Sequence, residues 1–132
     1  MLKKSAEFKD LDIDVIDWGM EVNLRGPMYC CRAIVGHMIE RGFGKIINLG
    51  SVAGCVGAAA GIDYSAEKSG IIGLTKSLAM YLGQYGINCN CVSPGPILSR
   101  PSMAKMQTYL GRVGETHEVA DLILYLCSEK AS

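Results

Sequence analysis

The stretch Lys45–Lys68, KIINLGSVAGCVGAAAGIDYSAEK, decides the fold of this chain. It begins with a short, nearly continuous apolar run, KIINL, which lies between glycines as a buried parallel strand should. Residues 50–61 are rich in glycine and alanine and predict a loop. From Asp63 to Tyr85, leucine and isoleucine recur on one face at helical spacing. A strand, a loop and a helix in this order predict an α/β protein with a parallel sheet.

The same stretch carries a candidate site for carbonyl or alcohol redox chemistry. Tyr64 and Lys68 are four residues apart, so on a helix they share one face and the ammonium can lie beside the phenol. A cation in that position favours the phenolate form and lowers the pKa of a phenol. Such a tyrosine can pass a proton to or from a substrate oxygen. Ser51, at the end of the strand, can hydrogen-bond the same oxygen as charge builds on it.

A Tyr-x-x-x-Lys pair alone is more typical of an ordinary solvent-exposed helix face than of a site. The context favours the site, because the pair opens a helix behind a buried strand and a serine-containing turn. In open parallel sheets, ligands bind beyond the carboxyl ends of the strands. Ser51 and Pro94-Gly95 are both expected at such ends.

On the N-terminal side, residues 14–41 have the apolar spacing of a helix. Gly26 and Pro27 interrupt this pattern and predict a bend or a break near its middle. Gly42-Phe43-Gly44 ends the helix. Residues 1–13 are charged and aperiodic, so we expect an irregular start.

On the C-terminal side, residues 87–93 (INCNCVS) predict a second strand, which Pro94-Gly95-Pro96 ends abruptly. A loop and a short helix are expected over residues 97–110. The last helix is expected to start near Thr116 as N-cap, with Glu118 in its first turn.

Length and composition exclude several classes of protein. The 132 residues suffice for one domain, and the 13 basic and 13 acidic residues balance, so no nucleic-acid or anionic-membrane partner is indicated. No apolar stretch is long enough to span a membrane. Residues 1–5 (MLKKS) lead into an acidic segment rather than the apolar core of a signal peptide. A cytoplasmic protein is therefore predicted.

The cysteines and histidines do not indicate a metal site. Their spacing suits neither a compact disulfide framework nor a CxxC zinc knuckle, and we expect the cysteines to be reduced, buried and packed as small hydrophobic side chains. The two histidines are far apart and are expected to be ordinary surface or boundary residues. The residues concerned are Cys30, Cys31, Cys55, Cys89, Cys91, Cys127, His37 and His117.

Several motifs follow one another at familiar intervals along the chain. They are N23-L24, I46-I47-N48-L49-G50-S51-V52-A53-G54, Y64-S65-A66-E67-K68, N90-C91-V92-S93-P94-G95-P96-I97 and G111-R112-V113-G114. In this order they resemble the C-terminal half of the classical short-chain dehydrogenase/reductase family, near its 3-oxoacyl-acyl-carrier-protein reductase-like members. The resemblance covers about residues 14 to 132.

The resemblance implies a partial Rossmann-like, doubly wound parallel sheet of class α/β, as a single domain over residues 1–132. In the strand order 3-2-1-4-5-6, this sequence matches strands 5 and 6 with their flanking helices. The N-terminal βαβ half, whose Gly-rich turn holds the cofactor pyrophosphate, is missing from the sequence, as is the last strand. The sheet edge that meets strand 4 is then expected to be exposed. Without that half, we expect residues 1–132 alone to be inactive.

The resemblance also implies roles for individual residues. Tyr64 matches the catalytic acid/base, and Ser51 matches the serine that orients the substrate carbonyl. Lys68 matches the lysine that lowers the tyrosine pKa and holds the nicotinamide ribose. Asn23 matches the asparagine that supports a water-linked proton relay to the lysine, although a helix-kink residue beside Gly26 is the alternative.

The implied cofactor is NAD or NADP. Pro94, Gly95 and Ile97 match the turn that lines the nicotinamide, with a plain strand terminator as the alternative for Pro94-Gly95. Ser99 falls where the family often has a residue that binds the carboxamide or phosphate. The loop from Gly95 to Gly111 is shorter than in many relatives, which implies a smaller lid over the substrate and a different substrate range.

Two functions therefore remain open. The first is an NAD(P)(H)-dependent oxidoreductase that reduces a carbonyl or oxidises an alcohol of a small-molecule substrate. The second is a non-catalytic remnant, from a truncated or split gene, that acts through helix-mediated association. In the family, the helices that match residues 14–41 and 63–85 form the dimer interface, so a homo-oligomer is expected in either case.

Overall fold

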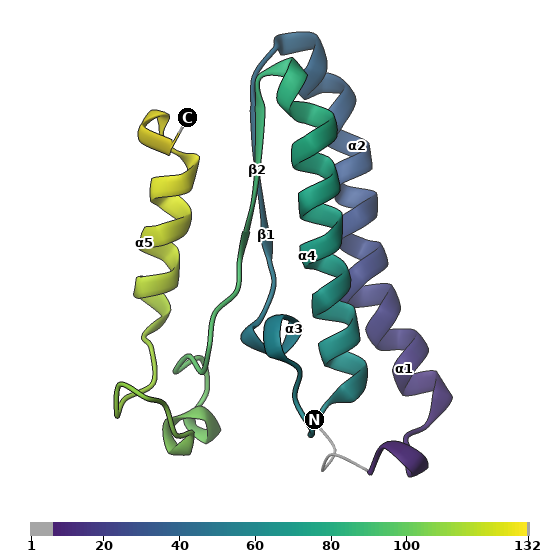
Figure 1. The fold of residues 1–132 in the computed structure, drawn as a ribbon, viewed down its shortest axis with the longest axis vertical. Helices are drawn as coiled ribbons and strands as arrows, with labels where there is room; N and C mark the ends of the chain where they lie inside the picture. The colour runs from purple at the N-terminus through teal and green to yellow at the C-terminus, as the bar shows by residue number, and fades with distance from the viewer. Residues whose placement is uncertain (1–6, 132) are drawn as a thin grey trace.

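A computed structural model describes residues 7–131 of the chain. Two parallel strands form the sheet, with α2 and α4 on one face and α5 on the other (Figure 1). The helices are α1 (Ile13–Met20), α2 (Gly26–Arg41), α3 (Val52–Val56), α4 (Ile62–Leu82) and α5 (Thr116–Cys127), and the strands are β1 (Gly44–Leu49) and β2 (Ile87–Val92). Short 3₁₀ turns lie at Phe8–Asp10, Gly83–Tyr85, Pro101–Lys105 and Glu129–Ala131. The predicted α/β class with a parallel sheet is confirmed.

The two strands pair in register from Gly44 opposite Ile87 to Leu49 opposite Val92. Parallel strands need a crossover connection, and α3 and α4 provide it. Both strands therefore end at the same edge of the sheet, as the sequence predicted for Ser51 and Pro94. The core lies between this sheet and helices α2 and α4, around four buried residues: Cys31, Ile46, Leu82 and Ile87.

Of the bend or break expected at Gly26-Pro27, the break does not occur. The helix continues from α1 into α2 through one π-turn, Glu21–Arg25. Within this turn the Gly26 N–H bonds to the carbonyl of Glu21, five residues earlier. Pro27 then occupies the first turn of α2, where a missing N–H is tolerated. The wider π-turn thus accommodates the proline, and the helix continues past it.

Other boundaries differ from the sequence prediction in detail. The loop at 50–61 contains the short helix α3, because the Ser51 side chain caps its first turn by accepting a bond from the Ala53 N–H at 3.2 Å. The N-cap of α5 is Glu115 rather than Thr116. The irregular start holds for Phe8–Asp10, and α1 already begins at Ile13; residues 1–6 of that prediction lie outside the described part.

All six cysteines are free thiols, but only Cys31 is fully buried, and Cys30, Cys55 and Cys127 are exposed. The expectation that they are all buried is therefore wrong in part. Among residues 7–131, no three His, Cys, Asp or Glu side chains are grouped so that they could hold a metal ion. None of the described helices is both long enough and apolar enough to cross a bilayer.

A buried polar network ties β1 to α4. The Asn48 amide donates to the Thr75 hydroxyl at 2.9 Å, and that hydroxyl donates to the Ile71 carbonyl at 2.8 Å. The Cys31 thiol of α2 lies 3.9 Å from the Asn48 carbonyl oxygen. Asn48 and Thr75 are 8% and 4% exposed, so water is not available to replace these partners.

Replacing Thr75 by valine is expected to lower the free energy of unfolding by about 1–3 kcal/mol, because it leaves the buried Asn48 amide without its acceptor. Urea denaturation monitored by circular dichroism measures the effect. Thr116→Val, at an exposed position on α5, is the matched control and should change stability by less than about 0.5 kcal/mol. Equal unfolding midpoints for the two variants would contradict a stabilising role for the network.

Candidate active site at the carboxyl ends of the strands

Tyr64 and Lys68 lie together on the first two turns of α4. The Lys68 Nζ is 5.7 Å from the centroid of the Tyr64 ring and donates a hydrogen bond to the Leu49 carbonyl at 2.8 Å. Leu49 is the last residue of β1, so the lysine connects the strand end to the tyrosine. Tyr64 is 40% exposed, which leaves its ring accessible to a ligand. The structure thus brings together the two residues that the four-residue spacing predicted to be neighbours.

Ser51 is held at the same strand end by the close packing of α3 on α4. A Cβ atom on Gly54 would lie 2.6 Å from the Lys68 backbone carbon, so only glycine allows α3 to come this near. The Ser69 hydroxyl fixes the contact by donating to the Gly54 carbonyl at 2.7 Å. Because the Ser51 oxygen serves as an acceptor in its capping bond, its hydroxyl hydrogen can donate to a ligand oxygen.

Asn23 lies in the π-turn, and its side-chain amide donates to the Glu67 carboxylate at 2.9 Å. Its side chain is therefore engaged with Glu67, one residue before Lys68, and not with Lys68. Pro27 has no N–H, so the Asn23 carbonyl lacks the donor that an α-helix supplies four residues later. Single π-turns within helices occur frequently at functional sites.

Glu67 is a residue that the sequence analysis missed. It is 2% exposed, and burial raises the pKa of its carboxyl above the ordinary value, while the Asn23 hydrogen bond acts in the opposite direction. A signal was present in the sequence, because Glu67 lies one turn before Ile71 on the apolar face of α4. A carboxylate on the buried face of a helix requires a polar partner.

The end of β2 lies next to the Ser51 turn. The Val52 N–H donates to the Pro94 carbonyl at 3.0 Å, and the Gly50 N–H donates to the Val92 carbonyl at 2.8 Å. These bonds hold the Ser51 and Pro94-Gly95 turns side by side beyond the sheet. Pro94 and Gly95 therefore lie at the carboxyl end of β2, where the sequence analysis expected them.

Ile97 and Ser99 follow the Pro94-Gly95 turn, at the start of the loop. Ile97 forms a parallel bridge with Gly114 and lines a pocket of about 370 Å³ whose walls also include Leu110 and Val119. Neither Ser51 nor Tyr64 lines that pocket, which lies between β2 and α5. Ser99 is exposed, and its N–H donates to the Ile97 carbonyl at 2.7 Å. Neither side chain forms a hydrogen bond with Tyr64 or Lys68 among the described residues.

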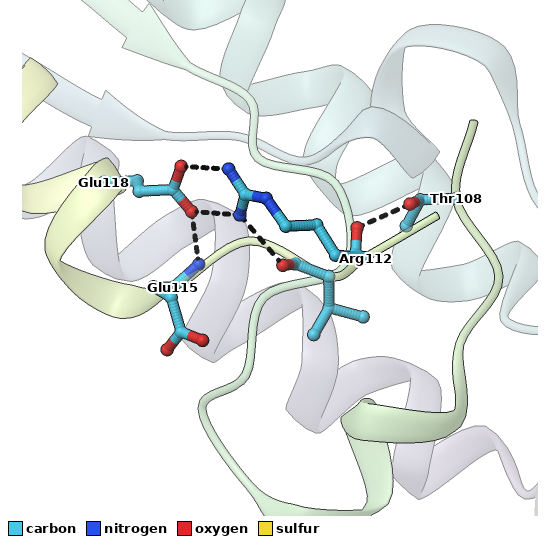
Figure 2. Close-up of polar contacts among 5 residues, drawn as sticks. Thr108, Arg112, Glu115 and Glu118 are labelled. Atoms are coloured by element: carbon cyan, nitrogen blue, oxygen red, sulfur yellow. Dashed lines mark hydrogen bonds and ion pairs between the residues drawn. The ribbon is translucent and has the colours of Figure 1, made fainter. Parts of the chain in front are cut away.

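The Ile97–Gly114 bridge closes the base of this loop. Polar contacts around Arg112 join the end of the loop to the start of α5 (Figure 2). The Arg112 guanidinium donates to both carboxylate oxygens of Glu118, at 2.8 and 2.7 Å. Glu118 also accepts the Glu115 N–H at 2.7 Å, which caps α5. The Thr108 hydroxyl donates to the Arg112 carbonyl at 2.5 Å. The loop is thus joined to the start of α5.

The Glu118 contacts predict a pH dependence of stability. Chiefly the Arg112 hydrogen bonds, and then the Glu115 N–H, lower the pKa of Glu118 from 4.5 to about 2. A carboxyl whose pKa is lower in the folded state stabilises the fold above its unfolded pKa and loses this contribution as the pH falls toward the folded pKa. The contribution should therefore be complete above pH 4.5 and disappear toward pH 2.

Replacing Glu118 by glutamine is accordingly expected to lower the thermal unfolding midpoint at neutral pH. The difference in midpoint from wild type should shrink as the pH falls from 4.5 toward 2. Thermal melts over a pH series measure it. Glu40→Gln, at an exposed carboxylate of α2, is the control and should follow the wild-type curve at every pH. A Glu118→Gln difference that does not change with pH would contradict this assignment.

Comparison with known proteins places this geometry among dehydrogenases and reductases. A family model described as enoyl-(acyl carrier protein) reductase matches residues 1–132. A probable short-chain type dehydrogenase/reductase of Bradyrhizobium diazoefficiens is 39% identical over 93% of this chain and 47% of its own length. A 3-oxoacyl-(acyl-carrier-protein) reductase of Aquifex aeolicus is 38% identical over 92% of this chain and 54% of its own. The chain thus spans about half the length of the curated relatives it matches.

The chain also resembles solved structures of a reductase and a dehydrogenase. A 3-oxoacyl-(acyl-carrier protein) reductase from Brucella melitensis with bound NAD superposes with a TM-score of 0.89 and 35% identity, over 96% of this chain and 50% of that one. An acetoin dehydrogenase from Salmonella typhimurium superposes with a TM-score of 0.88 and 33% identity, over 99% of this chain and 55% of that one. This likeness confirms the expected partial Rossmann-like architecture.

Proposed function

Because this chain belongs to the short-chain dehydrogenase/reductase family, near its 3-oxoacyl-acyl-carrier-protein reductases, we propose that it carries the proton-transfer machinery of an NAD(P)(H)-dependent oxidoreductase. The reaction is the reduction of a carbonyl, or the oxidation of an alcohol, in a small-molecule substrate. The contact that carries the proposal is that of Lys68, whose ammonium is bonded to the end of β1 and lies 5.7 Å from the Tyr64 ring centroid.

The donors at this site fit the nicotinamide-ribose half of NAD or NADP. A lysine ammonium has three N–H donors, and only one of them is needed for the Leu49 carbonyl. The others suit the hydroxyl groups of a ribose. Pro94 and Gly95 lie at the adjacent strand end and are proposed to line the nicotinamide. Ile97 and Ser99 are proposed to contribute to the same half of the cofactor from the start of the loop.

In the reducing direction, Tyr64 donates its phenolic proton to the carbonyl oxygen as that oxygen gains charge. Ser51 donates a hydrogen bond to the same oxygen and orients it. When bound, the reduced nicotinamide supplies the hydride that adds to the carbonyl carbon. In the oxidising direction the same groups work in reverse, and Tyr64 accepts the alcohol proton.

Lys68 and Asn23 are proposed to restore the proton on Tyr64. The ammonium beside the ring stabilises the phenolate that remains after proton donation. The Asn23 carbonyl, which lacks an α-helical donor because of Pro27, can accept a hydrogen bond from a water that leads to Lys68. Through this water and the Lys68 ammonium, a proton from solvent can then replace the one that the substrate has taken.

The second candidate, a non-catalytic module that associates through its helices, is favoured by exposed apolar side chains on α2 and α4. Tyr29 and Ile34 of α2 are 56% and 41% exposed, and Met80 and Tyr81 of α4 are 85% and 53% exposed. These surfaces also support the proposal of a homo-oligomer through α1–α2 and α4.

A cytoplasmic location is proposed along with the enzymatic function.

Titration of the natural protein that carries this chain with NADH and NADPH, followed by nicotinamide fluorescence, tests the function. Saturable binding of one of them, and its oxidation when a ketone or aldehyde panel that includes a 3-oxoacyl thioester is added, is the expected result. If millimolar cofactor neither binds nor is consumed, the oxidoreductase proposal is wrong and the association module is favoured.

A further inference from the structure

Glu67 is a carboxylate in the interior of the molecule for which the proposed chemistry has no use. It lies on α4 between Tyr64 and Ile71 and is 2% exposed. Its side chain contacts α1 and the π-turn that follows it, which together are called the first helical segment below. There its Oε2 accepts a hydrogen bond from the Asn23 amide at 2.9 Å. Burial of an ionisable group is costly unless the group has a specific partner, so the contact with Asn23 is the feature that needs explaining.

The first helical segment is shaped around this carboxylate at two places. Gly19 lies inside α1, where glycine is unfavourable, and a Cβ atom there would clash with the Glu67 Oε1 and come within 3.0 Å of its Cδ. One turn later, the π-turn widens the helix at Asn23 and presents the amide to Oε2. Both irregularities meet the same side chain.

Neighbouring contacts keep the π-turn close to α4. A Cβ atom on Gly70 would lie 2.9 Å from the Leu24 side chain, so Gly70 leaves room for the residue that follows Asn23. The charged groups that act on Glu67 are Asp63 and Lys68, both on its own helix. The first segment contributes the Asn23 amide, a neutral donor.

We infer that Glu67 is a positioning residue of the active site, which holds the side chain of Asn23 and with it the π-turn beside the Tyr64–Lys68 pair. The inference rests on the proposed oxidoreductase function. Glu67 touches neither Tyr64 nor the Lys68 ammonium through a hydrogen bond, so it acts through Asn23 and takes no part in the reaction itself.

Two substitutions matched in length separate the hydrogen bond from the space that the side chain fills. Glu67→Gln keeps an oxygen that can accept the Asn23 amide, whereas Glu67→Met fills the same space without an acceptor. Glu67→Leu replaces the methionine variant if circular dichroism shows that the latter is unfolded. Glu40→Gln, an exposed carboxylate on α2, is the control.

Steady-state kinetics of the natural protein with its nicotinamide cofactor provide the readout. Glu67→Met is expected to lower kcat by about tenfold or more with the cofactor KM within about twofold of wild type, and Glu67→Gln is expected to retain most of kcat. The double variant Asn23→Ala/Glu67→Met should be no slower than Asn23→Ala alone, because both changes remove the same contact. If Glu67 acted independently of the Asn23 contact, the two losses would instead multiply.

An unchanged kcat in Glu67→Met, or losses that multiply in the double variant, would overturn the inference while wild type remains active. Failure of the proposed function is recognised differently, because then wild type, the Glu40→Gln control and all Glu67 variants show no cofactor turnover. In that case the positioning role falls with the function on which it rests.

Discussion

Replacing Tyr64 by phenylalanine is expected to lower kcat by about a thousandfold while leaving nicotinamide binding intact. Phenylalanine fills the same space beside Lys68 but has no proton to give to the substrate oxygen. The loss should be equal in kcat and in kcat/KM, as for an interaction made only in the transition state. Kinetics followed by nicotinamide absorbance measure the loss, and fluorescence titration measures binding.

Tyr81 provides the matched control for this experiment. It lies on the same helix, with a ring that is 53% exposed and packs edge-to-face on Tyr85. Tyr81→Phe should therefore keep wild-type kcat. If Tyr64→Phe retains more than about a tenth of wild-type kcat, Tyr64 is not the general acid/base and the assignment of the site must change.

The second large effect is expected for Lys68→Met, which should lower kcat by about a hundredfold and also raise the KM for the cofactor. Methionine keeps the length of the side chain but removes the charge beside the Tyr64 ring and the donors for a ribose. It also leaves the Leu49 carbonyl without its partner. Initial rates at several cofactor concentrations separate the two parameters.

Lys76→Met tests whether loss of any cation from α4 has this effect. Lys76 is exposed and lies two turns farther along the helix, so its replacement should change neither parameter. Tyr64→Phe and Lys68→Met then have different signatures, because only the second raises KM. An unchanged cofactor KM in Lys68→Met would remove the ribose from the proposed role of this lysine.

The parts of the fold that were predictable from sequence have strong local signals. β1 is an apolar run between glycines, and α4 has a regular apolar face that ends in the fully buried Leu82. α3 was not predictable, because its five residues, VAGCV, include a glycine and two β-branched valines and have low helical preference by themselves. It forms because Ser51 caps it and because Gly54 lets it pack against the backbone of α4.

The continuous helix through Gly26-Pro27 was not predictable from the sequence either, because it too depends on tertiary contacts. Local sequence rules predict that proline ends or kinks a helix. Here Asn23 and Leu24 of the π-turn contact Glu67 and Gly70 of α4, and these contacts hold the segment on its path. Asn23 and Glu67 are 44 residues apart in the sequence. A contact between residues so far apart cannot be recognised from a local sequence pattern.

In the candidate site, too, features set by local sequence were predictable, and features set by tertiary contacts were not. Tyr64 and Lys68 were predictable as neighbours, because four residues on a helix fix their relative positions. Ser51 was predictable as a strand-end residue for similarly local reasons. The Glu67–Asn23 bond and the Ile97–Gly114 bridge depend on how distant segments pack, which the spacing of residues does not contain.

The base of the Ile97–Gly114 loop offers a place where the loop can be varied apart from the proposed site. The Ile97–Gly114 bridge and the Arg112–Glu118 ion pair close the loop with bonds of its own and of α5, and none of them involves Ser51, Tyr64 or Lys68. The segment between these anchors is therefore held by contacts that the Ser51–Tyr64–Lys68 group does not share. We expect that libraries confined to it change the loop while the proposed proton-transfer residues keep their places.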